Sequence, residues 1–113
     1  DPQLWWECIR EGTREILGKT GITNKTIQGI GIAYQMHGLV PMNSDGNLVR
    51  PSIIWCDSRA VSTGEATARE LGEELCRARL LNEPGNFTAS KLRWMQQHEP
   101  EHFQQIRTIL LLG

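Results

Sequence analysis

Two short polar segments lie at the ends of apolar stretches, where their side chains could contact a small ligand. The first is Gln35-Met36-His37-Gly38, which interrupts an otherwise apolar pair of expected strands. Polar groups displayed beside a glycine at the end of a strand are common ligand contacts. The alternative is a histidine that only completes a turn, next to a methionine packed in the core. Taken alone, the segment favours this alternative.

The second segment is Trp55-Cys56-Asp57-Ser58-Arg59, which brings a large aromatic ring, an acid and a base to the end of another expected strand. These residue types also suit a ligand site. The same residues equally fit a core tryptophan beside an ordinary surface ion pair, and Asp57 could cap the helix that follows.

Residues 98–102 read His-Glu-Pro-Glu-His, which matches the HExxH pattern of zinc proteases. The pattern binds zinc on an unbroken helix, where the two histidines lie one turn apart on one face. Pro100 lacks an N–H and disfavours helix at the residue before it. We therefore expect one helix to end and another to begin here, and we predict no metal ligand.

A phosphate-binding loop is not recognisable in the sequence. Gly29-Ile30-Gly31 begins like a dinucleotide loop, but Tyr34 occupies the position of the third glycine. No Walker loop is present either. We therefore expect the phosphate chemistry of any enzyme containing this chain to lie elsewhere.

The elements that must position the two polar segments are expected strands. Residues 28–34, 39–42 and 48–55 are apolar runs, and Asp45-Gly46 between the last two is a strong hairpin signal. They predict a three-stranded antiparallel meander over residues 28–55. An amphipathic helix is predicted before it over residues 2–17, with Asp1 as its cap and Gly18 as its stop.

Helices are predicted after Trp55. Ser62-Thr63-Gly64-Glu65 matches a capping box at the start of a helical stretch that breaks near Gly72. Residues 82–86 have the composition of a loop. A helix over about 88–97 follows, with Ala89, Leu92 and Met95 on one stripe; a shorter helix begins at Pro100, and residues 107–112 read as a buried strand. The order of elements predicts a mixed α/β layer.

Composition limits the classes of partner. Twelve basic and 13 acidic residues give a net charge of −1, which offers no electrostatic reason to expect nucleic acid or an anionic membrane. The apolar runs are far shorter than the roughly 20 residues needed to cross a bilayer. Three widely spaced cysteines without a CxxC pair favour reduced thiols, and no secretory leader is visible, so we expect a cytoplasmic protein.

A family resemblance rests on motifs spread over nearly the whole chain. These are GIGIAYQMHG at 29–38, Asp-Gly at 45–46, LVRPSIIWCDSR at 48–59, PGNFTASKLRW at 84–94 and Glu-Pro-Glu at 99–101. In this order they resemble the N-terminal domain of the FGGY carbohydrate kinases. The QMHG form resembles the xylulokinase branch, since glycerol kinases have a charged pair at the Met-His positions.

The resemblance implies a kinase of two actin-like, ribonuclease H-like domains around a cleft, with residues 1–113 as part of the sugar-binding N-terminal domain. It implies that Met36 and His37 line the sugar pocket and that Trp55 packs against a carbon face of the sugar. Asn86 falls where some relatives contact substrate. The expected substrate is D-xylulose, phosphorylated to D-xylulose 5-phosphate with ATP and Mg²⁺ in a longer parent chain; a homodimer is left open.

The resemblance also implies that essential parts lie outside residues 1–113. The family's first phosphate-binding loop should precede this segment, and its catalytic aspartate should lie beyond Gly113. We therefore expect no catalytic residue here, no ATP or Mg²⁺ bound to this segment and no kinase activity from it alone. A sibling kinase for another pentulose or a polyol, and a non-catalytic actin-like interaction module, remain as alternatives.

Overall fold

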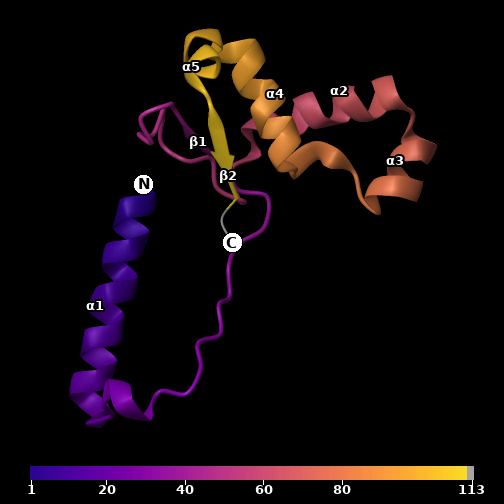
Figure 1. Ribbon diagram of the computed structural model, residues 1–113. Helices are drawn as coiled ribbons and strands as arrows, with labels where there is room; N and C mark the ends of the chain where they lie inside the picture. The colour runs from indigo at the N-terminus through magenta and orange to yellow at the C-terminus, as the bar shows by residue number, and fades with distance from the viewer. Residues whose placement is uncertain (112–113) are drawn as a thin grey trace. The chain divides into compact units, whose positions relative to one another are not determined.

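The computed structural model describes residues 1–111 and divides the chain into two compact units. Unit 1 is Asp1–Ala33, and unit 2 begins at Tyr34 and contains all the strands and the remaining helices (Figure 1). Both polar segments identified from the sequence belong to unit 2. Each unit is described by itself.

Unit 1 is built around the helix α1, Pro2–Thr20. Its start is as predicted: Asp1 accepts a hydrogen bond from the backbone N–H of Gln3 at 2.8 Å, and Pro2 occupies the first turn. The predicted end at residue 17 is wrong. Gly18 stays helical, and Gly21 ends the helix because it adopts the left-handed conformation, with φ of 68°.

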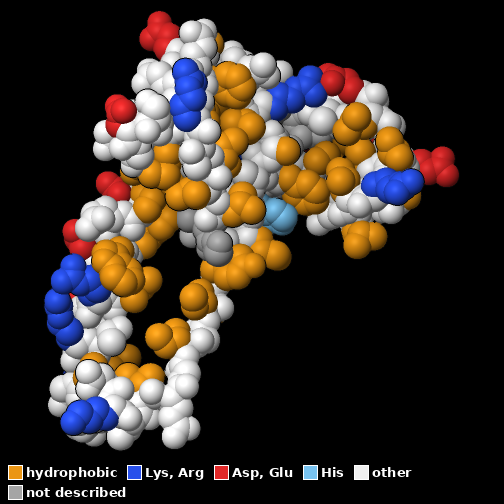
Figure 2. All heavy atoms as spheres, in the orientation of Figure 1, with side chains coloured by type: hydrophobic (Ala, Val, Ile, Leu, Met, Phe, Trp, Pro, Cys, Tyr) orange, Lys and Arg blue, Asp and Glu red, His pale blue; other side chains and the backbone are white. Residues whose placement is uncertain are grey.

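Apolar side chains of unit 1 are exposed. α1 has no buried residue, and Leu4, Trp6, Ile9 and Ile16 are all more than half accessible. A short 3₁₀ turn, η1 (Asn24–Thr26), leads into an extended segment whose isoleucines are also exposed. Figure 2 shows these hydrophobic side chains in orange along α1 and the segment after it.

Unit 2 contains a two-stranded antiparallel sheet formed by β1 (Val40–Met42) and β2 (Thr108–Leu110). Val40 pairs with Leu110 and Met42 pairs with Thr108. On the other edge of β1, isolated bridges join Leu39 to Ile53 and Met42 to Leu48. The tight turn at residues 43–47 forms as predicted, with the amides of Gly46 and Asn47 turned back onto Asn43.

The predicted three-stranded meander is not found. Residues 28–34 form no strand, and Ile30 and Ile32 are more than 80 % exposed. In the predicted meander, residues 28–34 would pair with one edge of β1. That edge pairs with β2 instead, and the carbonyl of Met42 accepts from the N–H of Arg107. The other edge faces the run after the turn, where the carbonyl of Pro41 accepts from the N–H of Val49. The Leu48–Trp55 run is reduced to two bridges because Arg50 and Pro51 lie outside the ladder.

Helices fill the sequence between Trp55 and β2. They are η2 (Ser58–Ala60), α2 (Val61–Leu71), α3 (Glu73–Leu80), η3 (Pro84–Asn86), α4 (Thr88–His98) and α5 (Pro100–Gln105). The predicted break at Gly72 is confirmed, and so is the helix break before Pro100. The predicted capping box is wrong: Ala60 precedes α2 and no side chain caps it, since η2 already supplies the preceding turn.

The core of unit 2 lies between β1, Ile53 and α4. Leu39, Ile53 and Met95 are fully buried; the partly buried residues around them are Leu92, Trp94, Phe103 and Ile106. Ala89 is exposed, although it was predicted to lie on the buried stripe of this helix. Lys91, which was not part of that stripe, is buried. The mixed α/β character is confirmed. The predicted last strand forms as β2, but its three residues are exposed and not buried, and residue 112 lies outside the described residues. No helix over residues 1–111 is both long and apolar enough to span a bilayer.

Candidate functional site

His37 lies at a sharp bend immediately before β1. Its φ of 63° places it in the left-handed region, which non-glycine residues occupy infrequently. Its ring stacks on Phe87, with centroids 4.9 Å apart and an angle of 20° between the planes. The next carbonyl, of Gly38, accepts from the hydroxyl of Thr88 at 3.2 Å. The residues around the start of α4 therefore hold both residues of the turn.

Trp55 is connected to the other candidate residues through its backbone. Its N–H donates to the side-chain oxygen of Gln35 at 3.0 Å, and its carbonyl accepts from the Nδ2 of Asn86. Asn86 directly precedes Phe87, on which His37 stacks. The structure thus brings the two polar segments and the loop at Asn86 together, although they are separated in sequence.

The exposure of Met36 and Trp55 differs from the packed positions that the non-functional alternatives gave them. Met36 is 66 % exposed and Trp55 is 56 % exposed, so neither is packed in the core. His37 is half-buried, and Asn86 keeps its Oδ1 buried without a hydrogen-bond partner among the described residues. Met36 and Trp55 are therefore free to contact a ligand, while Asn86 is oriented toward the backbone of Trp55.

Asp57 serves as a helix cap and as an ion-pair partner. Its carboxylate accepts from the backbone N–H of Arg59 at 3.1 Å and from the Arg59 guanidinium at 2.8 Å through each oxygen. Hydrogen bonding from Arg59 lowers the pKa of Asp57 below its usual value. The cap and surface ion pair considered from the sequence are both confirmed; the carboxylate already has a partner.

Lys91 was not identified from the sequence, yet it lies at the centre of this cluster. Its side chain is 0 % exposed, and its Nζ donates to the carbonyl of His37 at 2.6 Å. Burial lowers the pKa of Lys91, and the nearby charge of Asp57 opposes that shift. A lysine in the first turns of a helix is usually solvent-exposed. The one indication of burial in the sequence is that Lys91 lies one turn before Met95, on the same face of the helix.

Other segments singled out from the sequence are not part of this cluster, beginning with the two glycines at Gly29 and Gly31. A Cβ added at Gly29 or Gly31 would meet nothing within 4 Å, so the backbone there lies in open space. Residues 1–111 contain no group of three His, Cys, Asp or Glu side chains that could hold a metal ion. Glu99 of the His-Glu-Pro-Glu-His segment is bound by Arg50 at 2.7 Å.

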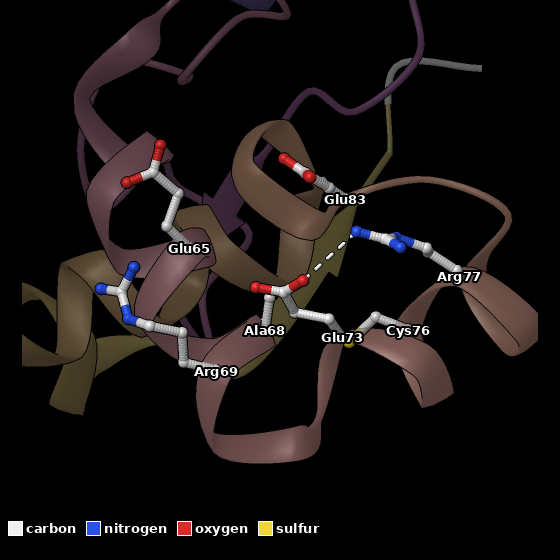
Figure 3. Close-up of a pocket in the computed structure, with 7 residues that line it drawn as sticks. All are labelled: Glu65, Ala68, Arg69, Glu73, Cys76, Arg77 and Glu83. Atoms are coloured by element: carbon white, nitrogen blue, oxygen red, sulfur yellow. Dashed lines mark hydrogen bonds and ion pairs between the residues drawn. The ribbon is translucent and has the colours of Figure 1, made fainter.

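A separate cavity of about 190 Å³ lies between α2, α3 and the loop after α3 (Figure 3). Charged side chains and Cys76 surround it; its lining residues are Glu65, Ala68, Arg69, Glu73, Cys76, Arg77 and Glu83. Glu73 and Arg77 form an ion pair of 3.2 Å along one face of α3. None of the four candidate sugar-contact residues lines this cavity.

The chain aligns with curated relatives over almost its entire length. It is 34 % identical over 111 residues to a xylulose kinase of Staphylococcus epidermidis and 32 % identical over 111 residues to a xylulose kinase of Escherichia coli. Each match covers 98 % of this chain but only 22 % of the relative. The chain therefore spans less than a quarter of the length of these relatives.

Solved structures and a family model agree with these relatives. A xyloylose kinase from Brucella ovis superimposes with a TM-score of 0.81 and 31 % identity over 98 % of this chain and 23 % of that one. A xylulose kinase from Bifidobacterium adolescentis, 22 % identical with a TM-score of 0.80, shares the fold. The model for the N-terminal domain of the FGGY family of carbohydrate kinases matches residues 1–113, and the chain belongs to that family.

Proposed function

We propose that this chain forms the acceptor-sugar part of a longer ATP-dependent carbohydrate kinase, which we call the parent kinase. In this proposal residues 1–113 belong to its actin-like N-terminal domain. The preferred substrate is D-xylulose, converted to D-xylulose 5-phosphate; ATP and Mg²⁺ bind elsewhere in the parent kinase. Xylulose kinases among the relatives support the substrate class, and the 22 % coverage supports a longer parent chain.

One observation carries the proposal for the site: Asn86 binds the backbone of Trp55, and its neighbour Phe87 stacks on His37, so these sequence-separated residues are linked around the start of α4. The imidazole of His37 can donate or accept one hydrogen bond with a sugar hydroxyl. The exposed indole of Trp55 offers a flat apolar surface for the carbon face of a sugar, and Met36 adds apolar contact. Asn86 acts by holding the backbone of Trp55.

These residues contribute to phosphoryl transfer by positioning. Transfer depends on holding the acceptor hydroxyl in line with the phosphate and on neutralising charge, with little covalent chemistry by the protein. His37 and Trp55 would orient the ketose so that one hydroxyl faces the reaction centre. The proton acceptor and the phosphate contacts come from other parts of the parent kinase.

The replacement His37→Ala in the parent kinase tests this assignment. An unpaired hydroxyl or site group costs about 1–3 kcal/mol, so kcat/KM for the ketose should fall roughly 5- to 150-fold. The KM for ATP should stay near its wild-type value, since the imidazole contacts only the acceptor. Initial rates over a panel of pentuloses and polyols measure both quantities and show which sugar is preferred.

His98→Ala is the matched control, because His98 also stacks on an aromatic ring, that of Trp94, with centroids 4.8 Å apart. It lies at the other end of α4, and its replacement should leave the ketose kinetics unchanged. Equal and mild effects of the two replacements would show that His37 only completes a turn.

A further inference from the structure

Lys91 is a buried cation that the proposed sugar site does not use directly. Its side chain is fully buried, and the one hydrogen bond of its Nζ found among the described residues goes to the carbonyl oxygen of His37 at 2.6 Å. Burying an ammonium group is unfavourable unless it is paired and hydrogen-bonded. A methionine of similar length would fill the same space without that cost. The position therefore calls for an explanation other than packing.

The contact of Lys91 falls on the residue with the least ordinary backbone in the site. His37 has a φ of 63°, and conformations of this kind persist when surrounding contacts hold them. Three contacts come from the start of α4: the Phe87 ring on the imidazole, the Thr88 hydroxyl on Gly38 O and the Lys91 ammonium on His37 O. Of these three contacts, the one from Lys91 is made to the backbone of His37 itself.

A second charged group, Asp57, leaves the contact between Lys91 and His37 in place. Asp57, at the end of the other polar segment, lies close enough for its charge to act on Lys91. Its carboxylate is already bound by the Arg59 guanidinium at 2.8 Å, so it does not take the ammonium away from His37. Lys91 therefore has the carbonyl as its direct partner and a carboxylate as a more distant counter-charge.

We propose that Lys91 is a positioning residue for the acceptor sugar: its ammonium group fixes the His37 carbonyl and so sets the direction of the imidazole. The inference rests on the proposed function of His37. The orientation of a ring follows from the backbone that carries it, because the side-chain rotamers open to a residue depend on φ and ψ. Losing the ammonium group frees this backbone and disperses the imidazole over several orientations.

Lys91→Met in the parent kinase is the first variant. It keeps the length of the side chain and removes the donor. We expect kcat/KM for the ketose to fall by about tenfold with the KM for ATP unchanged, as for loss of an interaction made with the acceptor alone. Arg93→Met is the matched control. It removes a cation from the same helix, but the guanidinium of Arg93 pairs with Glu70 and not with His37.

The double variant Lys91→Met/His37→Ala separates positioning from general damage. If Lys91 acts through His37, the double variant should be no slower with the ketose than His37→Ala alone. Lys91→Arg, which retains a cationic donor, should recover part of the lost activity. Additive losses, or equal losses for ketose and ATP, would overturn the proposal. If Lys91→Met does not fold, Lys91→Gln, which is shorter and neutral, is judged by the same comparison.

The ring signals of His37 in histidine-labelled parent kinase distinguish the two hypotheses. If His37→Ala leaves ketose kinetics unchanged, the sugar role of His37 is wrong. The proton signals of the stacked ring then decide on Lys91: a shift in Lys91→Met, absent in Arg93→Met, supports positioning. Unmoved signals would refute it whatever the kinetics.

Discussion

At the scale of single residues, Gly64 marks a close approach between two backbones in unit 2. It lies in α2 against η3, and a Cβ added there would come within 2.7 Å of both Gly85 N and Pro84 O. The hydroxyl of Ser90, on α4, donates to that same carbonyl of Pro84. Helix α2 can therefore pack on the loop that carries Asn86 only with a glycine at this position.

We predict that Gly64→Ala weakens this packing. The added methyl has no room and must displace backbone, which costs about 1–3 kcal/mol. Native-state hydrogen exchange of α2 and η3 amides in the parent kinase measures the change. Gly85→Ala is the control, because its Cβ would meet Val61 at 3.7 Å, an ordinary contact. Equal protection in the two variants would contradict the prediction.

Sequence reasoning reached the exposed residues of the site and missed the buried one. Polar and aromatic residues at the ends of apolar runs stand out, so His37, Trp55 and Asp57 could be selected. Lys91 could not, because burial of a lysine depends on a tertiary partner, here a carbonyl 54 residues earlier in the chain. Whether His37 and Trp55 contact a sugar stays a prediction.

At the scale of elements, an ion pair joins the hairpin after β1 to the junction of α4 and α5. The NH1 of Arg50 lies 2.7 and 2.8 Å from the two carboxylate oxygens of Glu99. The two side chains are only 11 % and 24 % exposed. Glu99 is also the residue between the two helices, with φ of −134° and ψ of 56°. The pair therefore ties the residue before α5 to the hairpin after β1.

We predict that Glu99→Gln destabilises unit 2 by about 1–3 kcal/mol, since a partly buried guanidinium loses its charged partner. A double-mutant cycle with Arg50→Met should show that the two effects are not additive. Hydrogen exchange of the α5 amides reports the loss. As control, Glu73→Gln breaks the exposed pair with Arg77 and should cost at most about 0.5 kcal/mol. A Glu99 effect no larger than the control would refute the role.

The helices after Trp55 were largely predictable, while the pairing of strands was not. Gly72 and Pro100 end helices for local reasons of backbone chemistry, which a sequence displays directly. β1 pairs with β2, which is distant in sequence, and no local sequence pattern indicates this pairing. Residues 28–34 have the pattern of a strand, but a strand forms only where an edge is available to pair with it.

At the scale of the whole molecule, the proposed function gives residues 1–113 the contacts to the acceptor sugar and leaves the phosphate contacts to other parts of the parent kinase. We predict that the purified 113-residue chain neither hydrolyses ATP nor phosphorylates a ketose. Residues that orient the acceptor sugar do not by themselves bind ATP. A coupled assay for ADP, with the parent kinase as positive control, measures both reactions. Turnover above background in a preparation free of host kinases would contradict this prediction and the assignment of residues 1–113 to the sugar side.

The pairing of β1 with β2 has a consequence for synthesis of the chain. Val40 pairs with Leu110, about 70 residues later, and Arg50 and His37 also wait for partners that come after residue 90. At roughly 5–20 residues per second, a ribosome needs about 4–14 s to add that stretch. For those seconds the edge of β1 that later pairs with β2, at Val40–Met42, has no partner and is open to other chains or to a chaperone. The order of translation thus makes this edge a part of the nascent protein that needs protection.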